Sequence, residues 1–197
     1  MRNLSISALI FTYRPCGERR KNMNVTQQNS AAFTGYRTTK LPFAPTEENV
    51  SKLKYKLTEA INAVYEKGVR YFYSGMCQGV DIWAAEAVLE FKKTHPDVEI
   101  ICAIPFEGHA DSLKGKALEE YENIVKNSFR ADCLKGRISY REIARAFNER
   151  NNYMVSNSDF LIAVCNERSI SPGGTANTVK MAQKKNMEII FVDPSEI

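Results

Sequence analysis

The sequence has few residues that bind metal ions, and no two of its cysteines form a C-x-x-C pair. Only two histidines occur in the 197 residues, so we expect neither a metal nor a cofactor. The odd number of widely spaced cysteines indicates a reducing compartment, and the predicted location is the cytoplasm. None of them has a base beside it in the sequence, which predicts core residues rather than nucleophiles. The five are Cys16, Cys77, Cys102, Cys133 and Cys165.

A long apolar run is also missing. Residues 4–11 are the longest apolar stretch near the start, but Ser5 and Ser7 interrupt it. The stretch is far shorter than the ~20 residues that a membrane span needs, and no small-residue cleavage site follows it. We predict no membrane partner, a poorly structured tail over residues 1–22, and a single domain over residues 23–197.

The predicted domain lacks an excess of charge of either sign. The whole chain holds 27 Lys and Arg against 23 Asp and Glu, a formal net charge of +4. Residues 1–22 account for this excess by themselves, with five cations and one acid. Proteins that bind duplex DNA usually present a basic face to the phosphates. The neutral domain therefore does not favour a nucleic-acid partner, although a local basic pocket stays open as an alternative.

Apolar runs alternate with helical patterns along the domain. In the first helical pattern Leu53, Leu57, Ile61 and Val64 recur at the spacing of one helix face. The predicted helices cover residues 46–67, 81–93, 118–125, 140–156 and 175–185, and the predicted strands cover residues 31–34, 69–73, 98–104, 131–134, 160–164 and 188–192. Such alternation is typical of right-handed βαβ crossovers. We predict an α/β fold, a single three-layer domain with a mainly parallel sheet.

Three junctions that contain glycine follow predicted strands, at residues 34–37, 74–81 and 171–178. In an open parallel sheet the ligand crevice lies beyond the carboxyl ends of the strands. Glycines let backbone N–H groups approach an anion, and a helix N-terminus adds unsatisfied donors. We predict a phosphate-recognising cleft. Its candidate residues are Gly35, Arg37, Ser74, Gly75, Gly79, Asp81, Gly173, Gly174 and Thr175, joined by Arg150.

Each candidate has a second interpretation that the sequence leaves open. The glycines also suit tight turns, and Asp81 suits the first turn of a helix as well as a ribose hydroxyl. Arg37 fits a solvated loop as well as an anion site, and Arg150 fits a helix surface. His95 and His109 have no partner nearby in the sequence, so no catalytic role is predicted for them.

Several motifs in order resemble one known family. They are Phe33-Thr34-Gly35-Tyr36-Arg37, Ser74-Gly75, Gly79-Val80-Asp81-Ile82-Trp83-Ala84-Ala85, Ile104-Pro105-Phe106, Ser158-Asp159 and Gly173-Gly174-Thr175-Ala176. Together they look like the YpsA/YoqJ family of the SLOG superfamily, over about residues 31–192. The superfamily includes the DNA-processing protein DprA and the Lonely-guy phosphoribohydrolases. The resemblance implies a Rossmann-like domain that binds a nucleotide or a nucleotide-derived ligand.

The phosphoribohydrolase motif matches only in part. Arg150, Met154 and the Pro172-Gly173-Gly174 turn fit it, but Asn151 stands for a lysine and Lys180 falls where the catalytic glutamate is expected. Cleavage of an N-glycosidic bond needs a carboxylate to activate water, which Lys180 cannot provide. A lysine at this position suits holding a phosphate better than activating water. This weighs against hydrolysis unless one of three acids reaches the site from another loop. The three are Asp81, Glu107 and Glu167.

The resemblance to DprA rests mainly on residues 74–85, and Cys77 and Glu86 depart from the DprA motif. Binding of single-stranded DNA calls for a positive groove with stacking aromatic rings, and the neutral domain does not favour it. We predict a module that binds or senses a nucleotide-derived small molecule. Hydrolysis of a nucleoside monophosphate is the alternative, and binding of single-stranded DNA is third. The sequence leaves catalytic turnover and the oligomeric state open.

Overall fold

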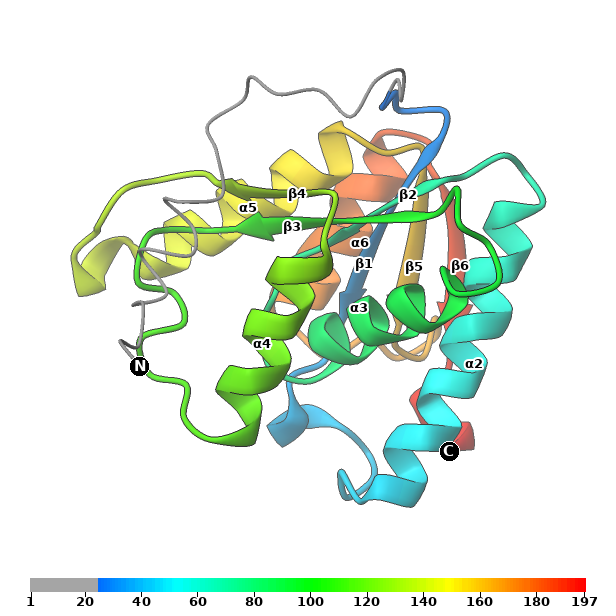
Figure 1. Cartoon of the computed structure of the whole chain (residues 1–197), viewed down its shortest axis with the longest axis horizontal. Helices are drawn as coiled ribbons and strands as arrows, with labels where there is room; N and C mark the ends of the chain where they lie inside the picture. The colour runs from blue at the N-terminus through cyan, green and yellow to red at the C-terminus, as the bar shows by residue number, and fades with distance from the viewer. Residues whose placement is uncertain (1–24) are drawn as a thin grey trace.

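Six parallel strands form one sheet in the computed structural model, which describes residues 25–197 (Figure 1). The tail predicted for residues 1–22 lies outside the described residues, as does the start of the predicted domain at residue 23. Every pairing in the sheet is parallel, in the order β4-β3-β2-β1-β5-β6. The strands are β1 (Ser30–Gly35), β2 (Tyr71–Ser74), β3 (Glu99–Ile104), β4 (Arg130–Cys133), β5 (Phe160–Val164) and β6 (Glu188–Val192).

Five α-helices of the described part cover the two faces of this sheet. One face carries α2 (Glu47–Tyr65), α3 (Val80–Phe91) and α4 (Lys116–Asn127), which lie in front of the sheet in Figure 1. The opposite face carries α5 (Ile143–Ser156) and α6 (Gly174–Lys184). Short 3-10 turns complete the described chain: η1 (Thr38–Lys40), η2 (Tyr140–Glu142) and η3 (Pro194–Glu196). The predicted single three-layer, Rossmann-like α/β fold is confirmed.

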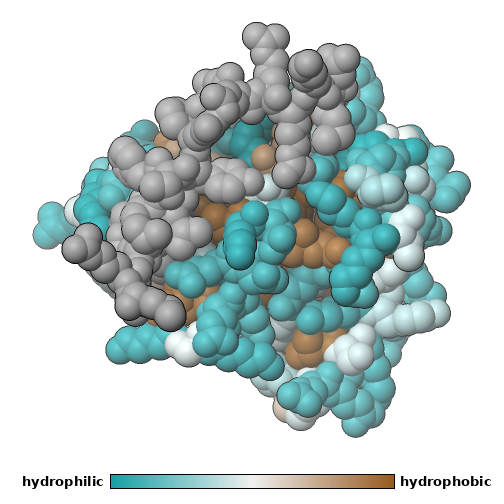
Figure 2. Space-filling view, in the orientation of Figure 1, coloured by the Kyte–Doolittle hydropathy of each residue, from teal (hydrophilic) through white to brown (hydrophobic). Residues whose placement is uncertain are grey.

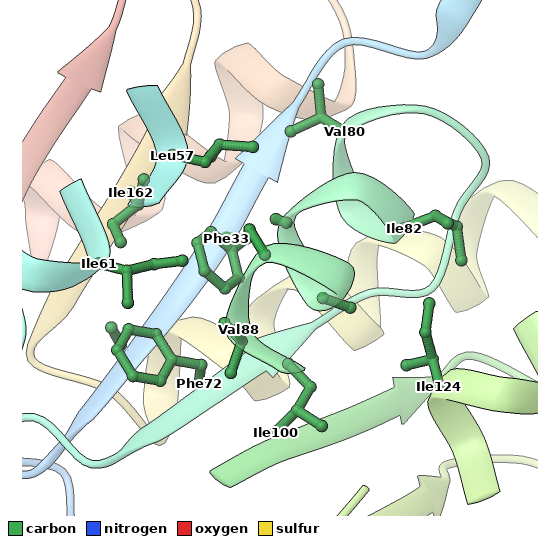
Figure 3. Close-up of a cluster of buried hydrophobic side chains, with 14 of the residues drawn as sticks. Phe33, Leu57, Ile61, Phe72, Val80, Ile82, Val88, Ile100, Ile124 and Ile162 are labelled. Atoms are coloured by element: carbon green, nitrogen blue, oxygen red, sulfur yellow. The ribbon is translucent and has the colours of Figure 1, made fainter. Parts of the chain in front are cut away.

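Side chains of successive strand residues enter two separate cores. In β1, Ala31 and Phe33 face α2 and α3, whereas Ala32 faces α5 and α6, because side chains alternate across a strand. In the first core the rings of Phe33 and Phe72 stack with centroids 5.8 Å apart (Figure 3). Both faces of the central strands are buried, which explains their continuous apolar sequences.

The longest helix begins and ends at residues that the sequence identifies. The side chain of Thr46 caps α2 by accepting from the N–H of Asn49 at 3.3 Å, which satisfies one of the free donors of the first turn. Leu57 and Ile61 are fully buried on the sheet side of α2. Gly68 follows with a φ of +96°, a conformation that favours glycine and stops the helix.

The outer side of the α2, α3 and α4 layer is largely polar. Figure 2 shows this face as mostly hydrophilic, with separate apolar areas between the polar side chains. No helix within residues 25–197 is long and apolar enough to cross a bilayer.

The order of the strands places a crevice at one point of the sheet. From β1 the chain proceeds outward through β2, β3 and β4, and it then returns to β5 on the other side of β1. The connections that follow β1 and β5 therefore diverge to opposite faces of the sheet. Such a switch point is where open α/β sheets hold their ligands, beyond the carboxyl ends of the strands.

Candidate functional site

A cleft of about 510 Å³ opens at the carboxyl ends of β1 and β5. Its walls come from the end of β1 with the following loop, from residues 77, 78 and 81, from one side of α5, and from residues 171–175. These segments are up to 140 residues apart in the sequence. The volume lies in the range of pockets that hold a small molecule.

Seven of the ten candidate residues line this cleft, and three lie behind its wall. The seven that line it are Gly35, Arg37, Asp81, Arg150, Gly173, Gly174 and Thr175. The other three are Ser74, Gly75 and Gly79, which contact residues of the wall from behind. All three glycine-containing junctions thus meet at one edge of the sheet, where the parallel topology places them.

Gly35 allows three elements to meet at the end of β1. A Cβ atom at this position would lie 2.4 Å from Cγ1 of Val80, the first residue of α3. On the other face, the hydroxyl of Thr175 in α6 donates to the Gly35 carbonyl at 2.8 Å. Gly35 therefore lets the N-termini of α3 and α6 approach the same strand end.

Replacing Gly35 with alanine is expected to lower the free energy of unfolding by about 1–3 kcal/mol, the usual cost of an added methyl in a packed core. Val80 is only 1% exposed, and even its Cβ would lie 2.6 Å from the new methyl, so no change of rotamer relieves the contact. Urea unfolding measures the loss. Gly136→Ala is the matched control, because no atom lies within 4 Å of a Cβ there. Equal unfolding midpoints for both variants would contradict this packing role.

Ser74, Gly75 and Gly79 shape the loop between β2 and α3. The Ser74 hydroxyl donates to the Asp81 carbonyl at 2.8 Å and accepts from the N–H of Met76 at 3.2 Å. Gly79 precedes α3 with a φ of +97°, and a Cβ there would meet the backbone of the loop that follows β1. A Cβ on Gly75 would lie 1.3 Å from Nη1 of Arg150. These residues therefore hold lining side chains in place.

A buried ion pair forms the floor of the cleft. Nη1 of Arg150 lies 3.2 Å from Oδ2 of Asp81, and the two side chains are 5% and 10% exposed. The same Asp81 oxygen accepts from the N–H of Cys77 at 3.2 Å. Burial raises the pKa of Asp81 above its ordinary value, while Arg150 and the Cys77 N–H oppose this rise. Asp81 is thus the second residue of α3, with Gly79 as the cap, and its carboxylate is engaged by Arg150.

Arg150 lines the cleft although it is 96% buried, and its Nε has no hydrogen-bond partner among the described residues. Buried polar groups are rarely left without a partner. The guanidinium also lies 5.7 Å from the ring centre of Phe147, one turn earlier on α5. The interpretation of Arg150 as a surface arginine is therefore wrong.

Two further cations lie at the mouth of the cleft. Arg37 is exposed, with its guanidinium carbon 5.1 Å from the ring centre of Phe147. Nζ of Lys40 donates to the Pro172 carbonyl at 3.2 Å, which brings the β1 loop to the loop before α6. Within residues 25–197 neither cation forms an ion pair. Both are therefore available to an anion.

The N-terminus of α6 opens beside these cations. Gly173 caps the helix with a φ of +145°, and the first turn contains no acidic residue. The first N–H groups of a helix have no partner within the helix. In α3, by contrast, Asp81 already occupies the first turn. An anion is therefore favoured at α6 rather than at α3.

Lys180 is exposed on α6 and does not line the cleft. The sequence-based suggestion that it holds a phosphate there is therefore not supported by its position. Glu107 and Glu167 do not line the cleft either. Among the described residues, Asp81 is the only acid in the lining.

Sequence reasoning missed Lys40, Cys77 and Phe147. Phe147 lies three residues before Arg150 on the same helix face, and helical spacing could have identified it. Lys40 carried no signal, because its position follows from the course of an irregular loop. The prediction that the cysteines lie in the core holds for Cys102 and Cys165, but Cys133 is exposed and Cys77 is half-buried in the cleft.

Cys77 has two polar neighbours that are distant in the sequence. Its Sγ lies 3.4 Å from Nη2 of Arg150 and 4.0 Å from Nε2 of His109. The expectation that no base lies near a cysteine, and that His109 has no partner, is therefore wrong for this pair. Burial, together with Arg150 and Arg37, lowers the pKa of His109 to about 4. The imidazole is accordingly neutral near pH 7.

The strand order and the position of the cleft define a Rossmann-like α/β protein. Within that class, the chain belongs to the YpsA family of SLOG proteins. The family model, described as the YspA SLOG family, matches residues 31–197. The resemblance drawn from the motifs is confirmed.

Curated relatives and one solved structure agree with this assignment. A UPF0398 protein of Halalkalibacterium halodurans is 27% identical over 157 residues, which cover 79% of this chain and 81% of the relative. A UPF0398 protein of Bacillus thuringiensis (strain Al Hakam) is 30% identical over 155 residues, 78% of this chain and 82% of the relative. DNA processing protein A from Helicobacter pylori, whose structure was solved to examine its binding of single-stranded DNA, has a TM-score of 0.50 at 19% identity, covering 86% of this chain and 71% of that one. At this identity the likeness concerns the fold.

Proposed function

We propose that the cleft binds the phosphate of a nucleotide or nucleotide-derived small molecule, and that the protein is a binding or sensing module. The observation that carries the proposal is the set of unpaired positive groups at the switch point. Arg37, Lys40 and the N-terminus of α6 surround the mouth of the cleft without an acidic partner in the described chain. A phosphate satisfies all three at once.

The inner end of the cleft suits the rest of such a ligand. Asp81 and the guanidinium of Arg150 offer an acceptor and a donor there, which fit hydroxyl or carbonyl groups of a sugar or base. Phe147 adds an aromatic ring to the same wall. A nucleotide bound in this way would have its phosphate at the mouth of the cleft, and polar groups inside the cleft would recognise its sugar or base.

The same geometry argues against hydrolysis as the main activity. Glycosidic cleavage uses a carboxylate to activate water, and Asp81 is the only acid that lines the cleft among the described residues. Its carboxylate is held by Arg150 and by the Cys77 N–H. Cations that bind substrate and product alike do not accelerate the chemical step. We therefore favour binding over turnover.

Thermal-shift measurements with nucleoside monophosphates and their ribosylated derivatives test the proposal. A ligand at about 100 times its Kd adds about 2.7 kcal/mol to the stability, which raises Tm by about 5–10 °C for a domain of this size. The unphosphorylated nucleosides are the matched controls, and we expect them to give a much smaller shift. Equal shifts for nucleoside and nucleotide would contradict phosphate recognition.

Two further measurements separate the remaining alternatives. Chromatography after incubation with nucleoside monophosphates detects free base, and release that is lost in Asp81→Asn would establish the hydrolase alternative instead. A single-stranded oligonucleotide is included because the similar DNA processing protein A binds single-stranded DNA. Salt-sensitive binding of that oligonucleotide, with no shift from mononucleotides, would replace the small-molecule proposal.

A further inference from the structure

We propose that Cys77 is a modification site, a thiol that reacts from the cleft with small oxidants of the hydroperoxide class, and that its oxidation excludes the ligand by blocking the inner end of the cleft, where the sugar or base would lie. The first part stands on the geometry around Cys77 alone. The second part rests on the proposed function, because it concerns the ligand of the same cleft.

Cys77 is reachable from the cleft and lies beside a fixed positive charge. The residue is half-buried and forms part of the lining, immediately before Gln78, which is exposed. Nη2 of Arg150 lies 3.4 Å from its sulfur, where the negative charge of a thiolate develops. A cation beside an accessible cysteine is the usual environment of a reactive thiol.

Two buried polar atoms at this point have no partner in the described chain. They are Nε of Arg150 and Nδ1 of His109. Arg150 is 96% buried and lines the cleft, so the energetic cost of its unpaired donor is high unless a further group binds there.

His109 is the second polar neighbour of the sulfur. Its Nε2 lies 4.0 Å from Sγ of Cys77. The rings of Phe106 and Phe147 pack edge-on against the imidazole, with centroids 5.7 Å away in each case, and hold it in this place. Because the imidazole stays neutral near pH 7, Arg150 is the charge partner of the sulfur.

The step balances without any group beyond the oxidant. The thiol sulfur attacks one oxygen of hydrogen peroxide, the S–O bond forms and the O–O bond breaks. The sulfur loses two electrons and becomes a sulfenic acid, while the peroxide is reduced to hydroxide. The hydroxide takes up the proton that the thiol released and leaves as water.

The other described cysteines provide internal controls. Cys102 is fully buried, and burial raises the pKa of its thiol to about 12. Cys165 is also buried, which raises its pKa to about 11. Cys133 is exposed as a residue, although desolvation of its sulfur raises the pKa of the thiol. Its sulfur donates to the Lys135 carbonyl at 3.2 Å, and no cation of residues 25–197 lies within hydrogen-bond distance of it. Exposure alone therefore predicts fastest reaction at Cys133, and the proposal predicts fastest reaction at Cys77.

Alkylation of the full chain by a limiting amount of iodoacetamide at pH 7 tests the reactivity. Peptide mapping by mass spectrometry assigns each label to its cysteine, including Cys16. We expect Cys77 to react about tenfold faster than Cys133, and the buried thiols to react only on unfolding. A rate at Cys77 equal to or below that at Cys133 would overturn the proposal. The measurement uses the unmodified sequence, so no variant has to fold.

A second measurement tests the consequence for the ligand. Treatment with hydrogen peroxide, followed by trapping with dimedone, is expected to mark Cys77, and the treated protein is expected to lose the thermal shift given by nucleoside monophosphates. Reduction of the treated protein with dithiothreitol should restore that shift, and Cys133→Ser should lose the shift after peroxide as the parent does. If Cys77 is reactive but nucleotides give no thermal shift, the proposed function is refuted and the reactivity of Cys77 is not. A nucleotide shift that survives full oxidation of Cys77 would refute the exclusion step alone.

Discussion

Replacing Arg150 with methionine is expected to lower the free energy of unfolding by about 3–5 kcal/mol, because removing one partner of a buried ion pair leaves the other charge uncompensated. The charge left behind is that of Asp81, whose side chain is 10% exposed and whose Oδ2 lies 3.2 Å from the guanidinium. Methionine keeps much of the length of the side chain, so lost volume is a minor cause. Chemical denaturation measures the loss, and nucleotide binding in the cleft should disappear with it.

A second substitution separates charge from packing. Asp81→Asn added to Arg150→Met removes the stranded charge, and we expect it to recover about half or more of the lost stability. Arg145→Met is the matched control on the same helix, because Arg145 is exposed and its ion-pair partner within residues 25–197 is Glu149, one turn away. It should change the stability by less than about 0.5 kcal/mol. If the double variant is less stable than Arg150→Met, the stranded charge is not the cause.

The effect of Arg150→Met should also depend on pH in a definite direction. Burial raises the pKa of Asp81 above 3.8, and Arg150 opposes the rise, so the variant has the higher folded-state pKa. A raised folded-state pKa of an acid means that the folded state binds the proton more tightly, and stability falls as the pH rises through that pKa. The deficit relative to the parent should therefore shrink as the pH is lowered toward 3.8.

The strands could be predicted because short apolar runs end at clear breaks. The sequence predicts strands over residues 160–164 and 188–192, and β5 and β6 have these bounds. For β2 the prediction of 69–73 is shifted from the observed Tyr71–Ser74, because Val69 is buried ahead of the strand and looks the same in sequence. The helix predicted over 140–156 begins as the separate turn η2, where Ser139 and Glu142 form a capping box.

The candidate site could be predicted where it depends on topology, and not where it depends on loop geometry. Parallel strands bring their carboxyl ends together, so the junctions after them were expected to meet. The contacts of Cys77 join it to Arg150 and His109, which are 73 and 32 residues away. His109 lies in an irregular segment without periodicity. No local pattern therefore indicated that these three side chains share one end of the cleft.

The cations at the mouth of the cleft should control ligand affinity without affecting the fold. Arg37→Ala and Lys40→Ala are each expected to raise the Kd of the nucleoside monophosphate by about tenfold, equivalent to about 1.4 kcal/mol, because a partly solvated contact to a phosphate is lost. Both side chains are exposed and form no ion pair within residues 25–197, and the hydrogen bond from Lys40 to the Pro172 carbonyl is exposed as well, so the free energy of unfolding should change by less than about 0.5 kcal/mol. Isothermal titration calorimetry at low salt measures the affinity.

Lys180→Ala is the control that decides between two positions for the phosphate. The partial phosphoribohydrolase motif suggests a phosphate beside Lys180, whereas the structure has this lysine exposed on α6 outside the cleft lining. Coulombic attraction between exposed groups is screened within about 10 Å at 0.1 M salt, so a lysine that does not touch the ligand should contribute little. We expect Lys180→Ala to bind like the parent. Weaker binding in Lys180→Ala, together with unchanged binding in Arg37→Ala and Lys40→Ala, would move the phosphate away from the mouth of the cleft.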